Sequence, residues 1–585
     1  MKHSPRTALR PLALSLGLAA LLALAPACPV AAADPPAVEA KRGMVVAAEP
    51  LAAEAGLSIL RAGGNAIDAA VATGFALAVT YPVAGNIGGG GFLVGRITTG
   101  DDAPRSVALD FRETAPAAAG RDLYVRAREL GIESPSTLGH LAAGVPGSVA
   151  GLLHALDRWG SLDRAAVLAP AIALAADGFP CGRRTARILA NERIASRMMR
   201  FPGTARVFYP GGKPIEEGAI FRQPELAATL RLIAEKGADG FYRGEIAGAI
   251  VKEMERGGGI ITLDDLAAYR PLERKAIRFP FRGHTIIAMP PPSSGGVCLQ
   301  QMLGILGRYP LDKLGHNSSA SLHLLAEAMR RSFADRNRSL GDPDHASLPL
   351  DHLLSAAHIE EMARGIDARR ATPSAEILGA SPAPGAPRRR EREQTTHYSV
   401  IDRHGSAVAV TTTLNGPFGA KVTVPGAGFL LNNEMDDFTA EPGKPNLYGL
   451  IQGEANAVAP GKRPLSSMTP TIVLDGDGRV EAVLGTPGGP TIITNVLQVL
   501  LNLFVHGLEA QAAVNAPKIH HQCLPDRIAH ERELPADVLE GLRGRGHELR
   551  ERSWIGDFQL IAVDRRRSLL LGASDPRGGG VARGH

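Results

Sequence analysis

One abrupt change of composition constrains the fold of this chain more than any other feature: a charged, Pro-rich tract ends at Gln394 and a β-hairpin begins. Residues 369–393 read RRATPSAEILGASPAPGAPRRRERE, which is poor material for a packed core, so we predict a flexible linker over residues 369–394. Residues 399–401 and 406–414 then have the composition of strands, with turn residues between them. The sequence therefore predicts that the chain passes here from a linker into a sheet.

The register of this hairpin decides which side chains surround Thr395. If Ile401 pairs with Ser406, Thr395 lies opposite Thr412, and the three threonines of residues 411–413 are all close to it. A shift of one residue would change which of them shares its face, so the hairpin alone does not choose between them.

Thr395 is the candidate nucleophile. A threonine hydroxyl needs a base within hydrogen-bond reach, and no Ser-His-Asp arrangement is evident. A free α-amine has a pKa of roughly 7.7 to 8.0 and could be that base. Thr395 acquires such an amine only if the bond after Gln394 is cut, so we predict a cleavage site between them. The alternative is an ordinary Thr-rich strand.

Five motifs make the chain resemble the γ-glutamyltranspeptidase family, over nearly all of its length outside the first residues. They are QTTHYSV at 394–400, TLN at 413–415, LLNNEMDDF at 430–438, KRPLSSMTPTIV at 462–473 and GTPGG at 485–489. The resemblance implies an α/β fold, a four-layer αββα sandwich of the N-terminal-nucleophile (Ntn) hydrolase type, formed jointly by two autoprocessed pieces. These are a large subunit, 34–394, and a small catalytic subunit, 395–585.

The resemblance also implies the reaction and the residues of the site. Thr395 attacks the γ-amide of glutathione or a related γ-glutamyl compound, and water or an amino acid or dipeptide then accepts the acyl group. No metal or cofactor is implied. By resemblance, Thr413 orients the nucleophile, and Gly488 and Gly489 stabilise the oxyanion. The substrate α-carboxylate is bound by Arg112, Ser466 and Ser467, and the ammonium by Glu434 and Asp437 with help from Asn415. Residues 441–453, which include Tyr448, form a lid.

The residues themselves support part of this assignment. Arg112 follows a predicted strand at 107–111, and a guanidinium suits bidentate carboxylate binding, although a single such arginine is usually structural. Gly488 and Gly489 lie between a strand at 480–484 and a helix at 492–503, where anionic charge is favoured. The segments 290–296 and 334–343, including Arg336, we assign to the scaffold, because Gly- and Pro-rich loops fix backbone positions.

Two other motifs have simpler explanations. The carboxylates of residues 434–437 could form a solvated acidic turn or a divalent-ion site, but calcium ligands normally occur in a longer spaced loop. The glycine-rich segment 85–91 precedes a strand at 92–96 and not a helix, so close backbone packing explains it better than dinucleotide binding. Helices are expected at 51–62 and, capped by Asn65, at 66–75.

The N-terminus predicts export. Residues 1–33 combine a basic start, an apolar stretch at 12–25 and a small-residue end, typical of a signal peptide. A lipid anchor at Cys28 is the alternative, and no segment has the length of a stable membrane span. We expect a periplasmic or secreted protein. Three of its five net positive charges lie in this leader, so nothing indicates nucleic-acid binding.

Two rival functions remain at this point. One is a different acylase on the same scaffold, acting on glutaryl-lactams such as cephalosporins or on poly-γ-glutamate. Asp437 and the complete lid-like tract argue against the glutaryl-lactam reading. The other is an exported binding protein, which would need no free threonine and would remain one piece.

Overall fold

The computed structural model describes residues 1, 35–98, 103–379, 395–441 and 443–585. All of the predicted signal peptide after Met1, including Cys28, and also Gln394 lie outside these residues. Residues 37–585 form one compact unit, and no helix among the described residues has the length and apolar character needed to cross a membrane.

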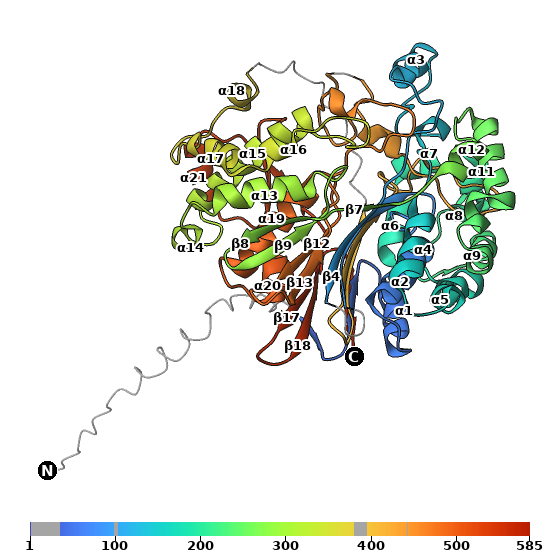
Figure 1. The fold of residues 1–585 in the computed structure, drawn as a ribbon, viewed down its shortest axis with the longest axis horizontal. Coiled ribbons are helices and arrows are strands. Elements are labelled where there is room, and N and C mark those ends of the chain that lie inside the picture. The colour runs from blue at the N-terminus through green and yellow to red at the C-terminus, as the bar shows by residue number, and fades with distance from the viewer. Residues whose placement is uncertain (2–34, 99–102, 380–394, 442) are drawn as a thin grey trace. The chain divides into compact units, whose positions relative to one another are not determined.

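Two seven-stranded antiparallel sheets form the centre of this unit (Figure 1). The first sheet has the order β1 (Val38–Ala40), β18 (Leu569–Ser574), β17 (Gln559–Asp564), β13 (Val480–Gly485), β12 (Thr471–Leu474), β9 (His284–Ala288), β8 (Ile277–Phe281). The second has the order β19 (Val581–Gly584), β2 (Met44–Ala47), β10 (Thr396–Ile401), β11 (Ala407–Thr413), β3 (Gly90–Ile97), β4 (Arg105–Phe111), β7 (Leu272–Arg274). Each sheet thus combines strands from both sides of Thr395.

Helices cover the outer face of each sheet. Over the second sheet lie α1 (Pro50–Arg61), α2 (Ala66–Thr80) and α4 (Ser148–Trp159), backed by α5 (Arg164–Asp177), α9 (Pro224–Lys236) and α11 (Gly244–Gly257). Over the first lie α13 (Gly295–Leu306), α19 (Thr491–Phe504) and α20 (Ala510–Asn515), with α15 (Ser319–Ser339) and α21 (Ala536–Gly544) outside them. Separate apolar clusters fill the space under each helical layer and between the sheets. The predicted four-layer αββα sandwich is confirmed.

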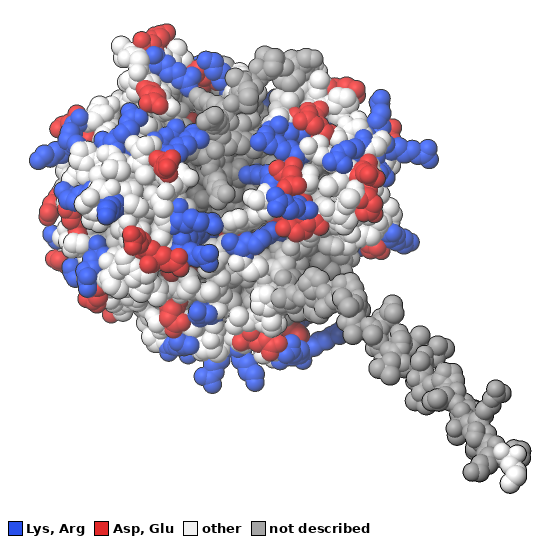
Figure 2. Space-filling model, turned by 180° about the vertical axis from the view of Figure 1, so that it is seen from behind, with Lys and Arg blue, Asp and Glu red and all other residues white. Residues whose placement is uncertain are grey.

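Shorter elements complete the chain. The helices are α3 (Leu123–Glu129), α6 (Arg183–Leu189), α7 (Glu192–Met198), α8 (Pro202–Phe208), α10 (Asp239–Tyr242), α12 (Leu263–Ala268), α14 (Leu311–Leu314), α16 (Leu350–Leu353), α17 (Ala356–Arg364) and α18 (Ser374–Leu378), with 3-10 turns η1 (His140–Ala142), η2 (Pro210–Gly212), η3 (Glu434–Asp437) and η4 (Glu454–Asn456). Two small sheets pair β5 (Phe179–Pro180) with β6 (Ile220–Phe221), and β14 (Ile519–His520), β15 (Ile528–Glu531) and β16 (Leu549–Arg552) with one another. On the face shown in Figure 2, basic and acidic side chains are interspersed, with no large area of one sign.

The hairpin register differs by one residue from the expected pairing of Ile401 with Ser406. Ile401 pairs with Ala407 and Thr396 with Thr412, which extends to Thr395 opposite Thr413, not Thr412. The Asp402 carboxylate explains the difference, because one of its oxygens accepts hydrogen bonds from the amides of His404 (2.8 Å) and Ser406 (3.0 Å). The side chain thereby stabilises a turn one residue longer than the predicted one.

The structure confirms the predicted helix cap at Asn65 and the close backbone packing of the glycine-rich segment, and it shortens the predicted linker. Asn65 caps α2 in a capping box with Asp68. In the glycine-rich segment, a Cβ on Gly88 or Gly89 would lie 2.1 Å from the carbonyl oxygen of Leu430 or Thr413, so bare backbone is required there. Residues 371–378 pack against the fold through α18, with Ser374 fully buried, so the expected linker does not include them.

Candidate active site

Residues from distant parts of the chain meet in one small cavity at the start of β10. Its volume is about 20 Å³, room for little more than one water molecule. Most of the predicted site residues line it: Arg112, Thr395, Thr413, Asn415, Glu434, Asp437, Tyr448, Ser466, Ser467 and Gly489. Arg336, which we had assigned to the scaffold, also lines it, whereas Gly488 does not. In this continuous chain the cavity is too small for a γ-glutamyl group.

Thr395 lies at the start of β10, buried and directly beside Thr413 on β11. Their hydroxyl oxygens are 3.3 Å apart, and either can donate. The amide of Asn415 donates to the Thr413 hydroxyl at 2.8 Å, which fixes the orientation of that hydroxyl. The corrected register explains this contact, because it places Thr395 opposite Thr413.

A buried charge cluster forms one wall of the cavity. The Arg112 guanidinium, at the end of β4, contacts the carboxylate of Glu434 through Nη1 and that of Asp437 through Nη2 at 2.5 Å. Glu113 lies 3.6 Å from the same Nη1. The fork of Arg112 is therefore occupied by the two carboxylates that were expected to bind an ammonium.

The cluster holds more acid than base, with three carboxyl groups around one guanidinium. Burial raises the pKa of Glu113 to about 7, although Arg112 opposes this, and burial also raises the pKa of Glu434 well above its usual value. Glu434 Oε2 is buried and has no hydrogen-bond partner among the described residues. An added cation would satisfy this oxygen and offset the repulsion between the carboxylates.

Arg336 on α15 provides the opposite wall and was missed by sequence reasoning. It is only 2% exposed, and its hydrogen bonds go to neutral groups: the hydroxyls of Ser294 (3.0 Å) and Ser467 (3.1 Å) and the amide oxygens of Asn337 and Gln452. Burial lowers the pKa of Arg336 to about 10. Among the described residues it forms no salt bridge with a carboxylate, so it can receive an anion. A sequence signal existed, since Arg336 continues the buried stripe of Met329 and Phe333.

Tyr448 connects the lid-like tract of residues 441–453 to the cavity. Its hydroxyl donates to the side-chain oxygen of Asn415 at 2.5 Å and lies 2.9 Å from the backbone oxygen of the same residue. Asn415 has a φ of 75°, and its Nδ2 donates to the Asn433 carbonyl at 2.9 Å. These contacts hold the tract over the cavity, and Asn415 links it to the acidic turn.

The turn between β13 and α19 carries the two glycines expected to stabilise an oxyanion. Gly488 and Gly489 have φ values of 137° and 55°, and their carbonyls accept from the first amides of α19. Within the described chain, neither glycine N–H has a hydrogen-bond partner. Gly489 lines the active-site cavity, but Gly488 lines a neighbouring cavity, so the two glycines mark the boundary between the cavities.

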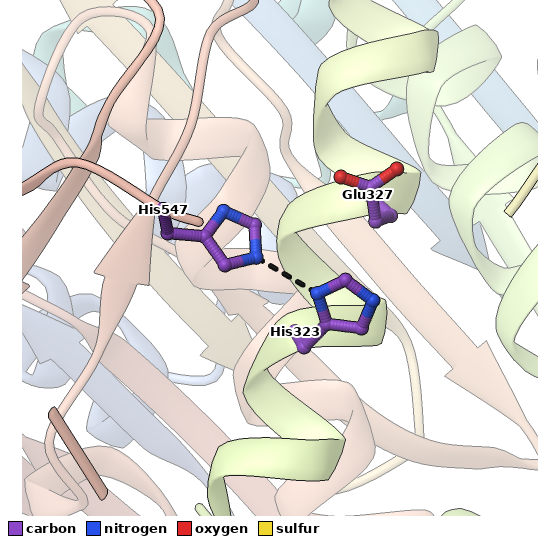
Figure 3. A group of neighbouring side chains, drawn as sticks. All are labelled: His323, Glu327 and His547. Carbon is purple, nitrogen blue, oxygen red and sulfur yellow. Dashed lines mark hydrogen bonds between the residues drawn. The ribbon is translucent and has the colours of Figure 1, made fainter. Parts of the chain in front are cut away.

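A group of potential metal ligands lies outside the active-site cavity, between α15 and the loop that precedes β16. His323, Glu327 and His547 have ligand atoms within 4.8 Å of one another (Figure 3). However, His323 Nδ1 and His547 Nε2 form a hydrogen bond of 2.8 Å, and Glu327 binds the guanidinium groups of Arg330 and Arg331. Burial lowers the pKa of His547 to about 3. The hydrogen bond between the two histidines and the ion pairs of Glu327 with two adjacent arginines explain this cluster better than a metal site does.

Comparison with known proteins adds evidence independent of this geometry. The family model described as gamma-glutamyltranspeptidase matches residues 52–585. A glutathione hydrolase proenzyme of Escherichia coli K12 is 43% identical over 584 residues, which cover 96% of this chain and 97% of that protein. A crystal structure of cephalosporin acylase from Bacillus halodurans matches with a TM-score of 0.82 and 29% identity, covering 94% and 97% of the two chains. A gamma-glutamyltranspeptidase chain of Helicobacter pylori matches with a TM-score of 0.54 and 42% identity, covering 57% of this chain and 94% of that one.

Proposed function

Because this chain belongs to the γ-glutamyltranspeptidase family, it is a γ-glutamyl acyltransferase and hydrolase of the Ntn type, and we propose that it acts on glutathione through Thr395. The observation that carries the residue assignment is the contact between the hydroxyls of Thr395 and Thr413, 3.3 Å apart in a cavity with one acidic and one cationic wall. A γ-glutamyl group presents an ammonium and a carboxylate, and these walls complement both.

Maturation begins with cleavage between Gln394 and Thr395. The new α-amine of Thr395 is the base that takes the proton of the threonine hydroxyl, and Thr413 orients that hydroxyl. The products are a large piece ending at Gln394 and a small piece of residues 395–585. The match of the Helicobacter pylori chain to only 57% of this one supports a polypeptide divided in two.

The substrate head lies between the two walls. Its ammonium faces Glu434 and Asp437, where Glu434 Oε2 has the vacant acceptor position, and Asn415 supports the same side. Its α-carboxylate faces Ser466 and Ser467, with Arg112 and Arg336 as the cations on either side. The guanidinium of Arg112 is bound to the carboxylates of the acidic wall, so Arg336 supplies the guanidinium that forms no salt bridge with any carboxylate the structure describes.

The reaction follows from this placement. Thr395 Oγ1 attacks the γ-carbonyl carbon while the α-amine of Thr395 takes the hydroxyl proton, and the amide N–H groups of Gly488 and Gly489 stabilise the oxyanion. The C–N bond of the substrate then breaks, the leaving nitrogen takes that proton and departs as an amine, and Tyr448 keeps the lid tract closed over the acyl-enzyme. Water or an acceptor amine then attacks the ester carbon and releases Thr395. The chain carries this out with its own residues, and no cofactor enters the proposal.

The acylase alternative is weaker here. A glutaryl-lactam has no ammonium to satisfy the buried carboxylates of the acidic wall. An acylase proenzyme of Pseudomonas sp. is also less similar to this chain, at 39% identity, than the glutathione hydrolase of Escherichia coli, at 43%. We further propose export to the periplasm or the medium, directed by the signal peptide of residues 1–33.

Mass spectrometry and N-terminal sequencing of purified protein test the assignment of Thr395. The wild type should show two pieces, the smaller one beginning at Thr395, and should release p-nitroaniline from γ-glutamyl-p-nitroanilide. Thr395→Ala should remain one chain and be inactive. A small piece that begins at any other residue would refute the assignment.

A further inference from the structure

A strap formed by residues 366–378 connects the part of the chain before Thr395 to the part after it. Ser374, in the middle of the strap, is fully buried. Its amide donates to the Asp526 carboxylate and its hydroxyl to the Cys523 carbonyl, both at 2.7 Å. The strap therefore joins the two parts of the chain at a place outside the two central sheets.

Two buried histidines form a hydrogen-bonded pair beside the strap (Figure 3). Nε2 of His323, on α15, lies 2.8 Å from the carbonyl oxygen of Asp367 in the strap. A carbonyl oxygen can only accept, so this nitrogen carries the hydrogen, and Nδ1 of neutral His323 accepts from Nε2 of His547 at 2.8 Å. His547 Nδ1 is buried and has no hydrogen-bond partner among the described residues. One more proton would thus leave an N–H group without an acceptor.

His521 has the same property at the other end of the strap. Its Nε2 lies 3.2 Å from Asp526 Oδ1, and an ionised carboxylate can only accept, so this nitrogen carries the hydrogen. Its Nδ1 accepts from the Cys523 amide at 3.1 Å. A proton added to Nδ1 would face that amide hydrogen. Asp526 and Cys523 are also the residues that bind Ser374, so His521 supports the strap through both of them.

The charges around these histidines leave no excess acid to accept another cation. Glu327 binds the guanidinium groups of Arg330 and Arg331, and Asp526 binds Arg330 Nη2 at 3.0 Å. Arg545, at the end of α21, adds a third cation, which donates to a hydroxyl and a carbonyl. The charged side chains of the strap itself are exposed: Asp367, Arg369, Arg370 and Glu376. A proton on any of the three histidines therefore adds positive charge beside arginines.

Burial opposes the charged form of each histidine. It lowers the pKa of His521 to about 4 and that of His547 to about 3, and it also lowers the pKa of His323. Arg330 acts in the same direction on all three. The folded state thus excludes protons that an exposed imidazole, with a pKa of 6.5, takes up. The stability that these histidines contribute is present above pH 6.5 and is lost as the pH falls below that value.

We propose that His323, His521 and His547 form an acid-sensitive clamp, which holds the strap at neutral pH and releases it in acid. Detachment of the strap removes the acceptor of His323 and the groups bound to Asp526, so the imidazoles become accessible to water and protons. The clamp is independent of the proposed function, because it exists in the uncut chain. If the chain is cut before Thr395, the strap leads to the end of the large piece, and its release loosens one connection between the two pieces.

Hydrogen exchange measured by mass spectrometry tests the clamp in the purified protein. Exchange of the strap, residues 366–378, is compared with that of the buried helix α2, residues 66–80, at pH 7, 6 and 5. Rates are corrected for the intrinsic pH dependence of amide exchange, and EDTA is present to remove metals. The variants are His547→Gln, the double variant His521→Gln/His547→Gln and the control His404→Gln. Glutamine keeps an N–H donor but takes up no proton in this range, and His404 is exposed in the turn between β10 and β11.

Between pH 7 and pH 5 the opening constant of the wild-type strap should rise at least about tenfold, because each histidine protonated only in the open state contributes about 20-fold. Glu327 and Asp526 contribute little, since the ordinary pKa values of their carboxyl groups, 4.5 and 3.8, lie below this interval. The rise should be severalfold smaller in His547→Gln, smaller still in the double variant and unchanged in His404→Gln.

Three results would overturn the proposal. They are strap opening that does not depend on pH, opening of the strap and α2 together in acid, and an equal rise in wild type and His547→Gln. The first two are measured on the wild type alone, so they remain decisive if a variant does not fold.

Discussion

Replacing Arg336 with methionine distinguishes recognition of the substrate carboxylate from recognition of its ammonium. The guanidinium is almost fully buried and forms no salt bridge with a carboxylate in the described part of the chain, so its attraction for a substrate carboxylate is not screened by solvent. Removing one partner of a buried charge pair costs about 2–5 kcal/mol. Ser466, Ser467 and Arg112 remain, so we expect the lower part of this range, about 2–3 kcal/mol, or a 30- to 150-fold loss of kcat/KM.

Three p-nitroanilides locate this loss on the substrate. The γ-glutamyl group has both charges, the glutaryl group only the carboxylate and the 4-aminobutyryl group only the ammonium. Arg336→Met should lose activity on the first two and change little on the third. Arg336→Lys should recover part of the loss, and Arg338→Met, an exposed position on the same helix, should resemble wild type.

Equal losses on all three anilides would contradict this reasoning, because they would mean that Arg336 holds Ser467 and the scaffold and does not face the carboxylate. A thermal melt and a gel showing both pieces establish that each variant has folded and matured.

The remaining predictions concern the acidic wall. Asp437→Asn should lower kcat/KM for the γ-glutamyl anilide about tenfold or more while the glutaryl rate falls less, and a proportional loss of both would assign Asp437 to the fold. Arg112→Lys should still mature but lose γ-glutamyl activity, because a lysine ammonium cannot bind Glu434 and Asp437 simultaneously as the two nitrogens of a guanidinium do. Unchanged steady-state kinetics would show that Arg112 has no part in the site. Burial raises the pKa of Glu113 to about 7 from 4.5, so the folded state keeps a proton that the unfolded chain releases, and stability falls as pH rises between these values. Glu113→Gln should therefore reduce the drop in Tm between pH 5 and pH 8, and identical Tm curves for both proteins would refute this.

The sequence predicted the features that depend on local pattern. The α2 cap and the close backbone packing of the glycine-rich segment are set by neighbouring residues, and the structure confirms both. A motif marks Thr395 as the candidate nucleophile, and the structure places it and most of its predicted partners, but not Gly488, around one cavity. The four-layer arrangement was predicted from the family resemblance. The order of strands and helices along the sequence would not have identified it alone.

Features that depend on distant contacts were missed. The register was displaced by one residue because the Asp402 side chain lengthens the turn, which composition does not reveal. Arg336 looked like part of a structural loop, and its position in the cavity wall becomes apparent only when α15 meets Ser467. Gly488 and Gly489 are adjacent in sequence, yet they line different cavities.

Because both central sheets combine strands from the two sides of Thr395, cleavage would make the melting temperature depend on protein concentration. Strand β10 lies between β2 and β11, and β11 lies beside β3, so neither piece has a complete sheet of its own. Before cleavage, unfolding is a unimolecular event, and the melting temperature is independent of protein concentration. After cleavage, full unfolding releases two chains, and mass action makes the midpoint rise with concentration. If the chain is cut before Thr395 as proposed, folding becomes an encounter between two molecules, and dilution destabilises the two-piece enzyme but not its precursor.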